Sequence, residues 1–255
     1  MRARNALVLA ASALTPAMAI AQTAADVVKW ADSARVAIEG AQRAGDLGRI
    51  TSARQLVERA LVANPNDPWL LHYQGYAIYR EALLRENRDK QDVRQLRDRA
   101  DSILERSAML LPLAESHALR ASLLGQMIGS NPIRGMTLGP RSAAEMNRAA
   151  ELSPRNPRVF LMRGIGAMFT PKMFGGGDDK AEANLLKAIE LFVGDKPTAP
   201  APAWGHGEAY IWLGQLYAKQ DKRDAALAAY HKALALEPDN AWLKTTLIPN
   251  LERKR

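Results

Sequence analysis

Histidines and carboxylates are the side chains that this chain offers for binding a metal ion, because it contains no cysteine. Its four histidines, His72, His117, His206 and His231, are far apart in the sequence, and none belongs to a His-Glu-x-x-His motif. The absence of cysteine also excludes thiolate nucleophiles, disulfides and zinc–thiolate sites. We therefore expect neither a metal site nor a bound cofactor.

Hydrolytic chemistry has no recognisable motif either. The chain lacks a Gly-x-Ser-x-Gly sequence, the turn that exposes a serine nucleophile in many hydrolases. Asp178 and Asp179 are adjacent, which is typical of a helix start and not of two carboxylates that face one cleft. We expect a protein that is not an enzyme, with an envelope hydrolase as a remote alternative.

A phosphate site is the third chemistry to consider, since Gly175, Gly176 and Gly177 precede a predicted helix start. Asp178 and Asp179 already occupy that start and repel anions, and the chain has no Gly-x4-Gly-Lys-Ser/Thr motif. We interpret the three glycines as a tight turn.

The elements that must position any functional side chain follow an export signal. Residues 1–22 read MRARNALVLAASALTPAMAIAQ, with two arginines, an apolar run and small residues before Gln22. This pattern predicts a signal peptide over residues 1–21; the alternative is a first helix of the fold. No later apolar run approaches the roughly 18 residues that a membrane span needs. We expect a product without a membrane span, in the periplasm of a Gram-negative cell.

Composition and charge narrow the class of partner. The chain is 47% hydrophobic and has 35 basic against 27 acidic residues, so it can bury a core and carries a formal net charge of +8. The basic residues alternate with acidic ones and form no stripe with interleaved aromatic residues. We expect no binding of nucleic acid.

Residues 207–240 read GEAYIWLGQLYAKQDKRDAALAAYHKALALEPDN. Gly214 and Ala226 are small where two antiparallel helices would cross, Tyr230 fills the space beside them, and Pro238 stops the second helix. This unit resembles the tetratricopeptide repeat (TPR) over its whole 34-residue length. The resemblance implies stacked helical hairpins that bind other proteins.

The second-helix pattern of this unit recurs four times upstream. The matching residues are Ala53, Val57, Ala60 and Pro65; Ala100, Leu104, Ser107 and Pro112; Ser142, Met146, Ala149 and Pro154; and Ala181, Leu185 and Ala188. The first-helix glycine returns as Gly75 and Gly164, with Ser122 in the third pair. The spacing predicts an all-α, right-handed solenoid of about five TPR-like antiparallel helix pairs plus a C-terminal capping helix.

Three divisions of the mature chain follow from this register. Residues 22–64 are a degenerate N-terminal helix pair, residues 65–240 are TPR-like pairs with insertions, and residues 241–255 are the capping helix and a basic tail.

The repeats are longer than 34 residues, and each excess is a separate prediction. Residues 80–99 are charged and lack Pro and Gly, so they should lengthen both helices of the second pair into a solvated prong. Residues 129–141 and 170–179 should be loops inside the third and fourth pairs. Residues 196–207 contain three prolines and should be an extended connection, with Trp204 either tucked between pairs or stacked on a ligand.

The resemblance also implies which first-helix residues line the concave face. The expected partner-binding residues are Trp69, His72, Tyr76, Tyr79, Arg80, Leu123, Met127, Ile165, Met168 and Phe169. The middle of this face is apolar, with aromatic residues at one end, so it departs from the pattern of Asn, Lys and Arg residues with which many peptide-binding repeats clamp a carboxylate.

Two readings of that face stay open. In one, the groove binds a segment of an envelope protein or peptide, or an apolar small molecule. In the other, the chain fills its own groove with its terminal helix or its long loops, since an open apolar face of that size is unusual. We expect an exported scaffold that binds another envelope protein. The alternative is a periplasmic carrier or accessory subunit that binds an apolar small molecule for a transport system.

Overall fold

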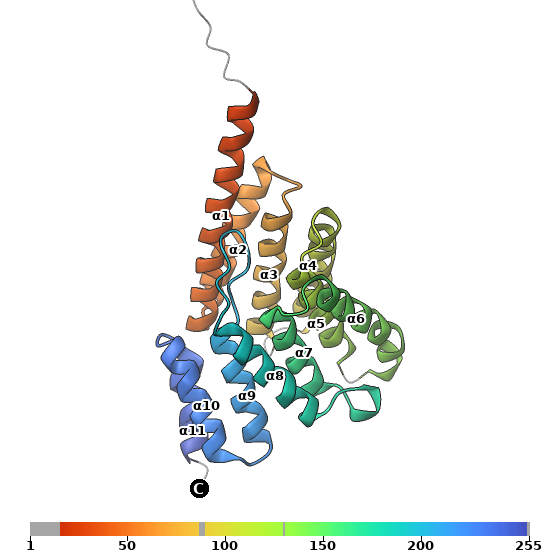
Figure 1. Ribbon diagram of the computed structural model, residues 1–255, viewed down its shortest axis with the longest axis vertical. Helices are drawn as coiled ribbons and strands as arrows, with labels where there is room; N and C mark the ends of the chain where they lie inside the picture. The colour runs from red at the N-terminus through yellow and green to blue at the C-terminus, as the bar shows by residue number, and fades with distance from the viewer. Residues whose placement is uncertain (1–15, 87–89, 130, 254–255) are drawn as a thin grey trace, which may run out of the picture.

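The computed structural model describes residues 16–86, 90–129 and 131–253, and within these ranges the regular elements are helices (Figure 1). The helices are α1 (Pro16–Ala44), α2 (Leu47–Ala63), α3 (Pro68–Arg85), α4 (Lys90–Leu110), α5 (Ala114–Ile128), α6 (Pro132–Leu152), α7 (Pro157–Phe169), α8 (Asp178–Phe192), α9 (His206–Lys219), α10 (Arg223–Leu236) and α11 (Ile248–Arg253). A short 3-10 helix spans Lys172–Phe174, and a π-helical turn spans Leu243–Leu247.

The helices form consecutive pairs, as expected of a TPR-like solenoid. Contacts join α1 to α2, α3 to α4, α5 to α6, α7 to α8, and α9 to α10, and each first helix also contacts the first helix of the next pair. The predicted all-α solenoid of five helix pairs is confirmed. Residues 1–15, which carry most of the predicted signal peptide, lie outside the described residues, and residues 16–22 are the first turns of α1.

Proline ends the second helix of four pairs, as the sequence predicts. Pro65, Pro112, Pro154 and Pro238 each lie two residues beyond the last residue of α2, α4, α6 and α10. Proline cannot donate the hydrogen bond that would continue the helix. The chain then starts a new first helix after a short turn.

Close approach within a pair requires a residue without a side chain. A Cβ atom at Gly75 would lie 2.5 Å from Cγ of Leu104, and one at Gly214 would lie 2.4 Å from Cε1 of Tyr230. Gly164 has the same relation to Leu185, at 2.7 Å. The small residues therefore do what their spacing predicts: they let the two helices of a pair cross in contact.

The C-terminal segment covers the last pair. Leu243, Ile248 and Leu251 are buried in one cluster with Ile211 and Tyr230 of that pair. The predicted capping helix is confirmed, although its first part is a π-helical turn. Capping removes from water the apolar face that a further repeat would otherwise cover.

The helices of the second pair are long, as predicted, but their extension is not exposed to solvent as expected. The helices α3 and α4 have 18 and 21 residues, against 14 in each of α9 and α10. Val93 in the extension is buried, and Leu83, Leu84 and Leu96 pack against the core. The extension is part of the packed body and is not a solvated prong.

The prediction of a loop over residues 129–141 is wrong, because α6 runs through most of this range. The side chain of Asn131 accepts hydrogen bonds from the first turn, and Pro132 suits the first helical position. Pro140 removes one hydrogen bond inside the helix, but Ser142 ties the helix to α5 by donating to a backbone carbonyl at 2.8 Å. The cap at Asn131 and the contact of Ser142 with α5 therefore outweigh the helix-breaking effect of Pro140.

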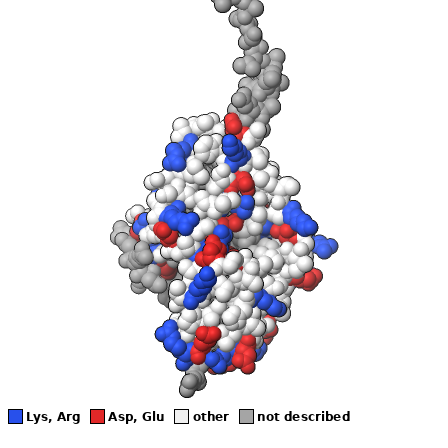
Figure 2. Space-filling view, turned by 90° about the vertical axis from the view of Figure 1, so that its left-hand side faces the viewer, with Lys and Arg blue, Asp and Glu red and all other residues white. Residues whose placement is uncertain are grey.

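Charge is distributed over the surface without a dominant sign on the face that includes α1. Figure 2 shows acidic and basic side chains interleaved down this face. No helix of the described residues combines the length and the apolarity that crossing a membrane needs.

Two glycines of α7 offer a matched test of helix packing. Gly164→Ala should lower the free energy of unfolding by about 1–3 kcal/mol, because its Cβ meets the side chain and backbone of Leu185. Gly166→Ala should raise it by roughly 0.5–1 kcal/mol, because beyond its chain neighbours and the backbone of its own helix no atom lies within 4 Å of the added Cβ, and alanine favours the helix. Urea unfolding measures both, and equal effects would contradict the packing argument.

Candidate functional site

The predicted concave residues do not form an open groove. His72, Tyr76, Tyr79, Arg80, Leu123 and Ile165 are buried, whereas Trp69, Met127 and Met168 are half-buried. Of the ten, Phe169 is the one that is exposed, at 71%. Of the two readings that the sequence left open, a groove filled by the chain itself describes most of this face. Whether any of these residues contacts a partner stays a prediction.

The covering segment is the connection between α8 and α9, here called the strap (residues 195–205). Trp204 is buried and stacks on Tyr76 with ring centroids 5.1 Å apart. The hydroxyl of Tyr73 donates to the carbonyl oxygen of Pro200 at 2.9 Å. Figure 1 shows the segment folded back over the first two helix pairs. The extended connection is thus present up to residue 205, although His206 and Gly207 already belong to α9. Trp204 is tucked in as predicted, but against Tyr76 of the second pair and not between adjacent pairs.

Gly205 makes the return from the strap into α9 possible. Its φ is 110°, in the left-handed region, and an added Cβ would lie 2.9 Å from both Leu161 and Phe192. Any other residue would be strained and would collide at this position. The position of Trp204 is therefore fixed from both sides, by stacking and by the turn.

Two buried arginines flank Trp204. Arg80 forms a two-pronged ion pair with Glu208, and Arg158 pairs with Asp195 of the strap at 2.6 Å. Burial lowers the pKa of Arg80, but the carboxylate of Glu208 together with Tyr76 and Tyr79 more than offsets it and holds this pKa well above its usual value. These pairs satisfy charges that would otherwise be costly inside the groove.

The same ion pairs draw the two ends of the solenoid together. Arg80 of α3 reaches α9, and Arg43 at the end of α1 pairs with Asp239 after α10 at 2.8 Å. The first two pairs and the last pair thus meet across the concave side.

His72 lies at the base of this cluster. The hydroxyl of Ser107 donates to the Pro68 carbonyl, so it accepts the hydrogen bond that it shares with Ser116. Ser116 in turn accepts from Nδ1 of His72 at 2.9 Å. Burial, with the neighbouring charge of Arg158, lowers the pKa of His72 to about 3. The ring is therefore neutral, and Nε2 presents a lone pair.

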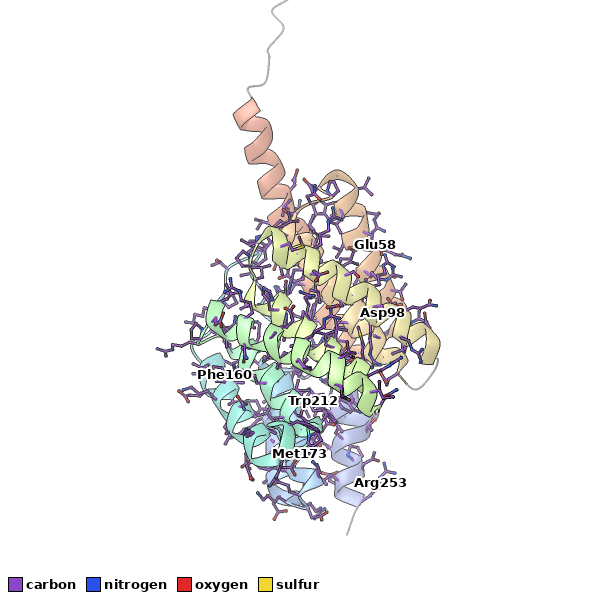
Figure 3. All side chains as sticks on the ribbon, turned by 90° about the vertical axis from the view of Figure 1, so that its right-hand side faces the viewer. Glu58, Asp98, Phe160, Met173, Trp212 and Arg253 are labelled. Atoms are coloured by element: carbon purple, nitrogen blue, oxygen red, sulfur yellow. The ribbon has the colours of Figure 1, made fainter. Side chains whose placement is uncertain are left out.

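The most exposed of the predicted concave residues, Phe169, borders a cleft. A surface cleft of about 360 Å³ is lined by Met168, Phe169, Thr170, Pro171, Lys172, Gly177, Asp178 and Lys219. The Phe169 ring meets Trp212 edge-on at 5.9 Å, and Figure 3 labels Trp212 and Met173 at this end of the molecule. Met173 and Phe174, on the turn beyond α7, are 82% and 72% exposed.

The turn after α7 is a tight one, as its glycines predict. An added Cβ on Gly176 would lie 1.9 Å from the Thr170 carbonyl oxygen, and Gly177 donates to the Ala167 carbonyl at 2.8 Å. Lys219 pairs with Asp178 at 2.7 Å. The helix start thus holds its own carboxylates and a lysine, and the glycines shape the wall of the cleft.

Sequence reasoning found Met168 and Phe169 but missed Trp212, Met173 and Phe174 as parts of the accessible surface. Trp212 faces the neighbouring pair, and its distance from Phe169 in the sequence gives no indication of contact. The apolar pair Met173 and Phe174 next to three glycines was the available signal, since large apolar residues in a turn cannot reach a core.

The remaining histidines do not assemble a metal site. His117 lies 2.6 Å from Glu145, and His206 stacks on Phe192, whereas His231 is exposed. Among the described residues, no group of three or more histidines and carboxylates is placed to hold a metal ion.

Comparison with known proteins agrees with the fold. A family profile, tetratricopeptide repeat, matches residues 207–240. A thermophilic TPR protein of Thermus thermophilus is similar at 25% identity and a TM-score of 0.58, over 81% of this chain and 92% of that one. The HusA haemophore from Porphyromonas gingivalis is similar at 25% identity and a TM-score of 0.55, over 77% and 94%.

A third structure, the APC/C hetero-tetramer Cut9-Hcn1, aligns at 16% identity and a TM-score of 0.54, over 82% of this chain and 35% of that one. At this identity the likeness concerns the fold alone. No curated protein matches the sequence.

The buried state of His72 predicts a pH dependence of stability. In the unfolded chain His72 binds a proton below about pH 6.5, whereas in the folded protein it stays neutral down to about pH 3. The contribution of the neutral His72 ring to the free energy of unfolding is therefore fully present well above pH 6.5, and it falls as the pH drops below that value. Between pH 7.5 and 5.0 the wild type should lose about 2 kcal/mol more than His72→Gln.

Urea unfolding at the two pH values measures this difference. His231→Gln is the matched control, since it removes an exposed histidine, and it should behave as the wild type. Equal losses in the wild type and in His72→Gln would mean that the folded protein can protonate this ring.

Proposed function

We propose that this chain, in which residues 207–240 match the tetratricopeptide repeat and whose fold is similar to that of a TPR protein, is a non-enzymatic scaffold, exported to the periplasm, that binds an envelope protein. The binding surface is the cleft beside Phe169 together with Met173 and Phe174. TPR folds serve protein–protein interaction, and the pattern of residues 1–21 supports export.

One observation carries the choice of surface. Phe169, Met173 and Phe174 lie within six residues, and each exposes more than two thirds of its area beside a cleft. A cluster of large apolar side chains that is exposed to solvent is typical of an interaction site. Methionine adds a flexible, polarisable contact that adapts to a partner.

The charges at the rim of the cleft indicate which kind of side chain a partner would insert. Lys172 and Lys219 are at the rim, but Asp179 and Asp178 neutralise them at 3.5 and 2.7 Å. Charge therefore contributes little net attraction, and the main contact is an apolar side chain inserted beside Phe169. A helix or loop with one large apolar anchor fits this arrangement.

A photo-crosslinking amino acid at Phe169 tests the surface in living cells. It should give one discrete adduct with an envelope protein, and the same probe at Val62, exposed on α2, should not. Met173→Asp should reduce the Phe169 adduct at least tenfold, since it places a charge in the apolar contact. Identical adducts from both probe positions would refute the assignment.

An apolar small-molecule carrier is the second candidate, favoured by the likeness to the HusA haemophore. The cleft walls include Met168 and Phe169, which suit an apolar ring system. Titration of the purified protein with haemin should then shift the haem absorbance, and Phe169→Asp should abolish the shift. An unchanged spectrum leaves the scaffold as the function.

A further inference from the structure

The first turns of α6 contribute no buried side chain to the core. Every residue from Ile133 to Arg148 is exposed or half-buried, and the first buried residue of this helix is Ala149. The other second helices, α2, α4, α8 and α10, each bury their fourth residue: Ile50, Val93, Ala181 and Ala226. The first part of α6 therefore packs on α5 and turns its opposite side to solvent.

That solvent-facing side is uncharged. Ile133 and Met136 are 75% and 79% exposed, and positions three or four apart lie on one face of a helix. The exposed residues that continue this face are small and carry no charge: Thr137, Pro140, Ala143 and Ala144. We call these six residues the α6 face. No ionised group on it would have to lose its hydration if the face met an apolar layer.

A row of arginines borders the α6 face. Arg134, Arg141 and Arg148 are seven residues apart, which places them along one side of the helix. The sequence has no acidic residue from 129 to 144, and the carboxylate of Glu145 is already shared between a histidine and an arginine of α5. The border is therefore positively charged.

The contacts of these arginines leave most of that charge available. Arg134 donates to a backbone carbonyl, which is uncharged, at 3.2 Å. Asp101 lies 3.9 Å from Arg141 but is bonded to Arg120 at 2.9 Å. The pair that Arg148 forms within the helix is solvent-exposed, and such pairs are weak.

A second element exposes large apolar side chains on the same side of the molecule. Met173 and Phe174 are 82% and 72% exposed. In Figure 1, α6 and the turn after α7 both project on the side away from α1. Figure 3 looks onto this side and labels Met173 there. Two elements of different helix pairs thus present protruding apolar side chains in one direction.

From these observations we infer that this side of the molecule binds the surface of a phospholipid bilayer that contains anionic lipids. Ile133 and Met136 insert at the level of the headgroups, and the arginine border contacts lipid phosphates. A helix that combines an exposed apolar face with basic residues is suited to lie in the plane of a membrane surface. Each basic residue near such a surface adds attraction to anionic headgroups.

Charge distinguishes a bilayer from a second copy of this chain as the occupant. A second copy would bring its own α6 face with the same three arginines and no acidic residue over 129–144, so the two borders would repel each other. An anionic bilayer offers negative charge wherever the arginines reach. The inference does not depend on the cleft beside Phe169, so either assignment can fail without the other.

Binding to vesicles tests the inference. The protein is used without residues 1–21, because an apolar leader would itself bind lipid, and the buried residues of the described chain begin only at Val27. Vesicles of phosphatidylcholine mixed with phosphatidylglycerol are compared with vesicles of phosphatidylcholine alone, by flotation at low ionic strength. The protein should bind the anionic vesicles at least tenfold more tightly, and added salt should weaken this binding.

Variants locate the contact on the protein. The double variant Ile133→Asp with Met136→Asp should bind the anionic vesicles at least tenfold more weakly, whereas Val62→Asp, at an 84% exposed position of α2, should bind as the wild type. Arg141→Gln should weaken binding about fivefold, and Arg59→Gln, exposed on α2, should not. Circular dichroism checks that each variant keeps its helicity.

A single fluorescent label gives an independent readout, because the chain contains no cysteine. Met136→Cys labelled with an environment-sensitive dye should shift its emission to the blue when anionic vesicles are added. The same dye on Val62→Cys should not shift. This comparison does not require an aspartate variant to fold.

Several results would overturn the inference. One is equal binding to both kinds of vesicle, and another is vesicle binding that the Ile133 and Met136 substitutions leave unchanged. A wild type that is a dimer in light scattering, with a monomeric double variant, would make a second copy the occupant. A photo-crosslinker at Met136 that gives a discrete protein adduct in cells, without vesicle binding, would make it a protein. Phe169→Asp should leave vesicle binding unchanged, which separates this surface from the cleft.

Discussion

Contact between the two helices of each pair is the constraint on which the rest of this structure depends. Gly75, Gly164 and Gly214 have no room for a Cβ atom, because Leu104, Leu185 and Tyr230 occupy that space. Each hairpin so formed is apolar on two sides and must be covered by another hairpin or by a cap. The regular stack, the buried second-helix alanines and the capping segment after α10 all follow from this one requirement.

Stacking alone leaves an apolar and aromatic inner face, and the chain covers it in two ways. The strap places Trp204 on Tyr76, and the ion pairs of Arg80 with Glu208 and of Arg43 with Asp239 bring distant pairs together. Burying the charges of Arg80 and Glu208 carries a desolvation cost that their pairing offsets. The result is an inner face that is largely closed, with an accessible apolar cleft at its end beside Phe169.

In this arrangement two surfaces of the inner side differ in their accessibility to solvent. The cleft beside Phe169 is open and apolar, and its lysines are neutralised by neighbouring aspartates, so it suits insertion of a side chain without rearrangement. The face that the strap covers is closed, because Trp204 is buried against Tyr76 and Arg158 is paired with Asp195 of the strap. A partner can therefore reach the first surface directly, whereas the strap shields the second from solvent.

The sequence by itself determined the helix pairs, their crossing glycines, the proline stops and the cap, because each depends on residues a few positions apart in one hairpin. It also indicated that residues 196–207 are extended. It misjudged residues 129–141, where the cap of Asn131 and packing on α5 outweigh Pro140, and it could not tell an open groove from a filled one. Only the tertiary structure decided that Trp204 lies on Tyr76 and that Arg80 meets Glu208, since partners 128 residues apart are joined by the curvature of the whole stack, to which every pair contributes.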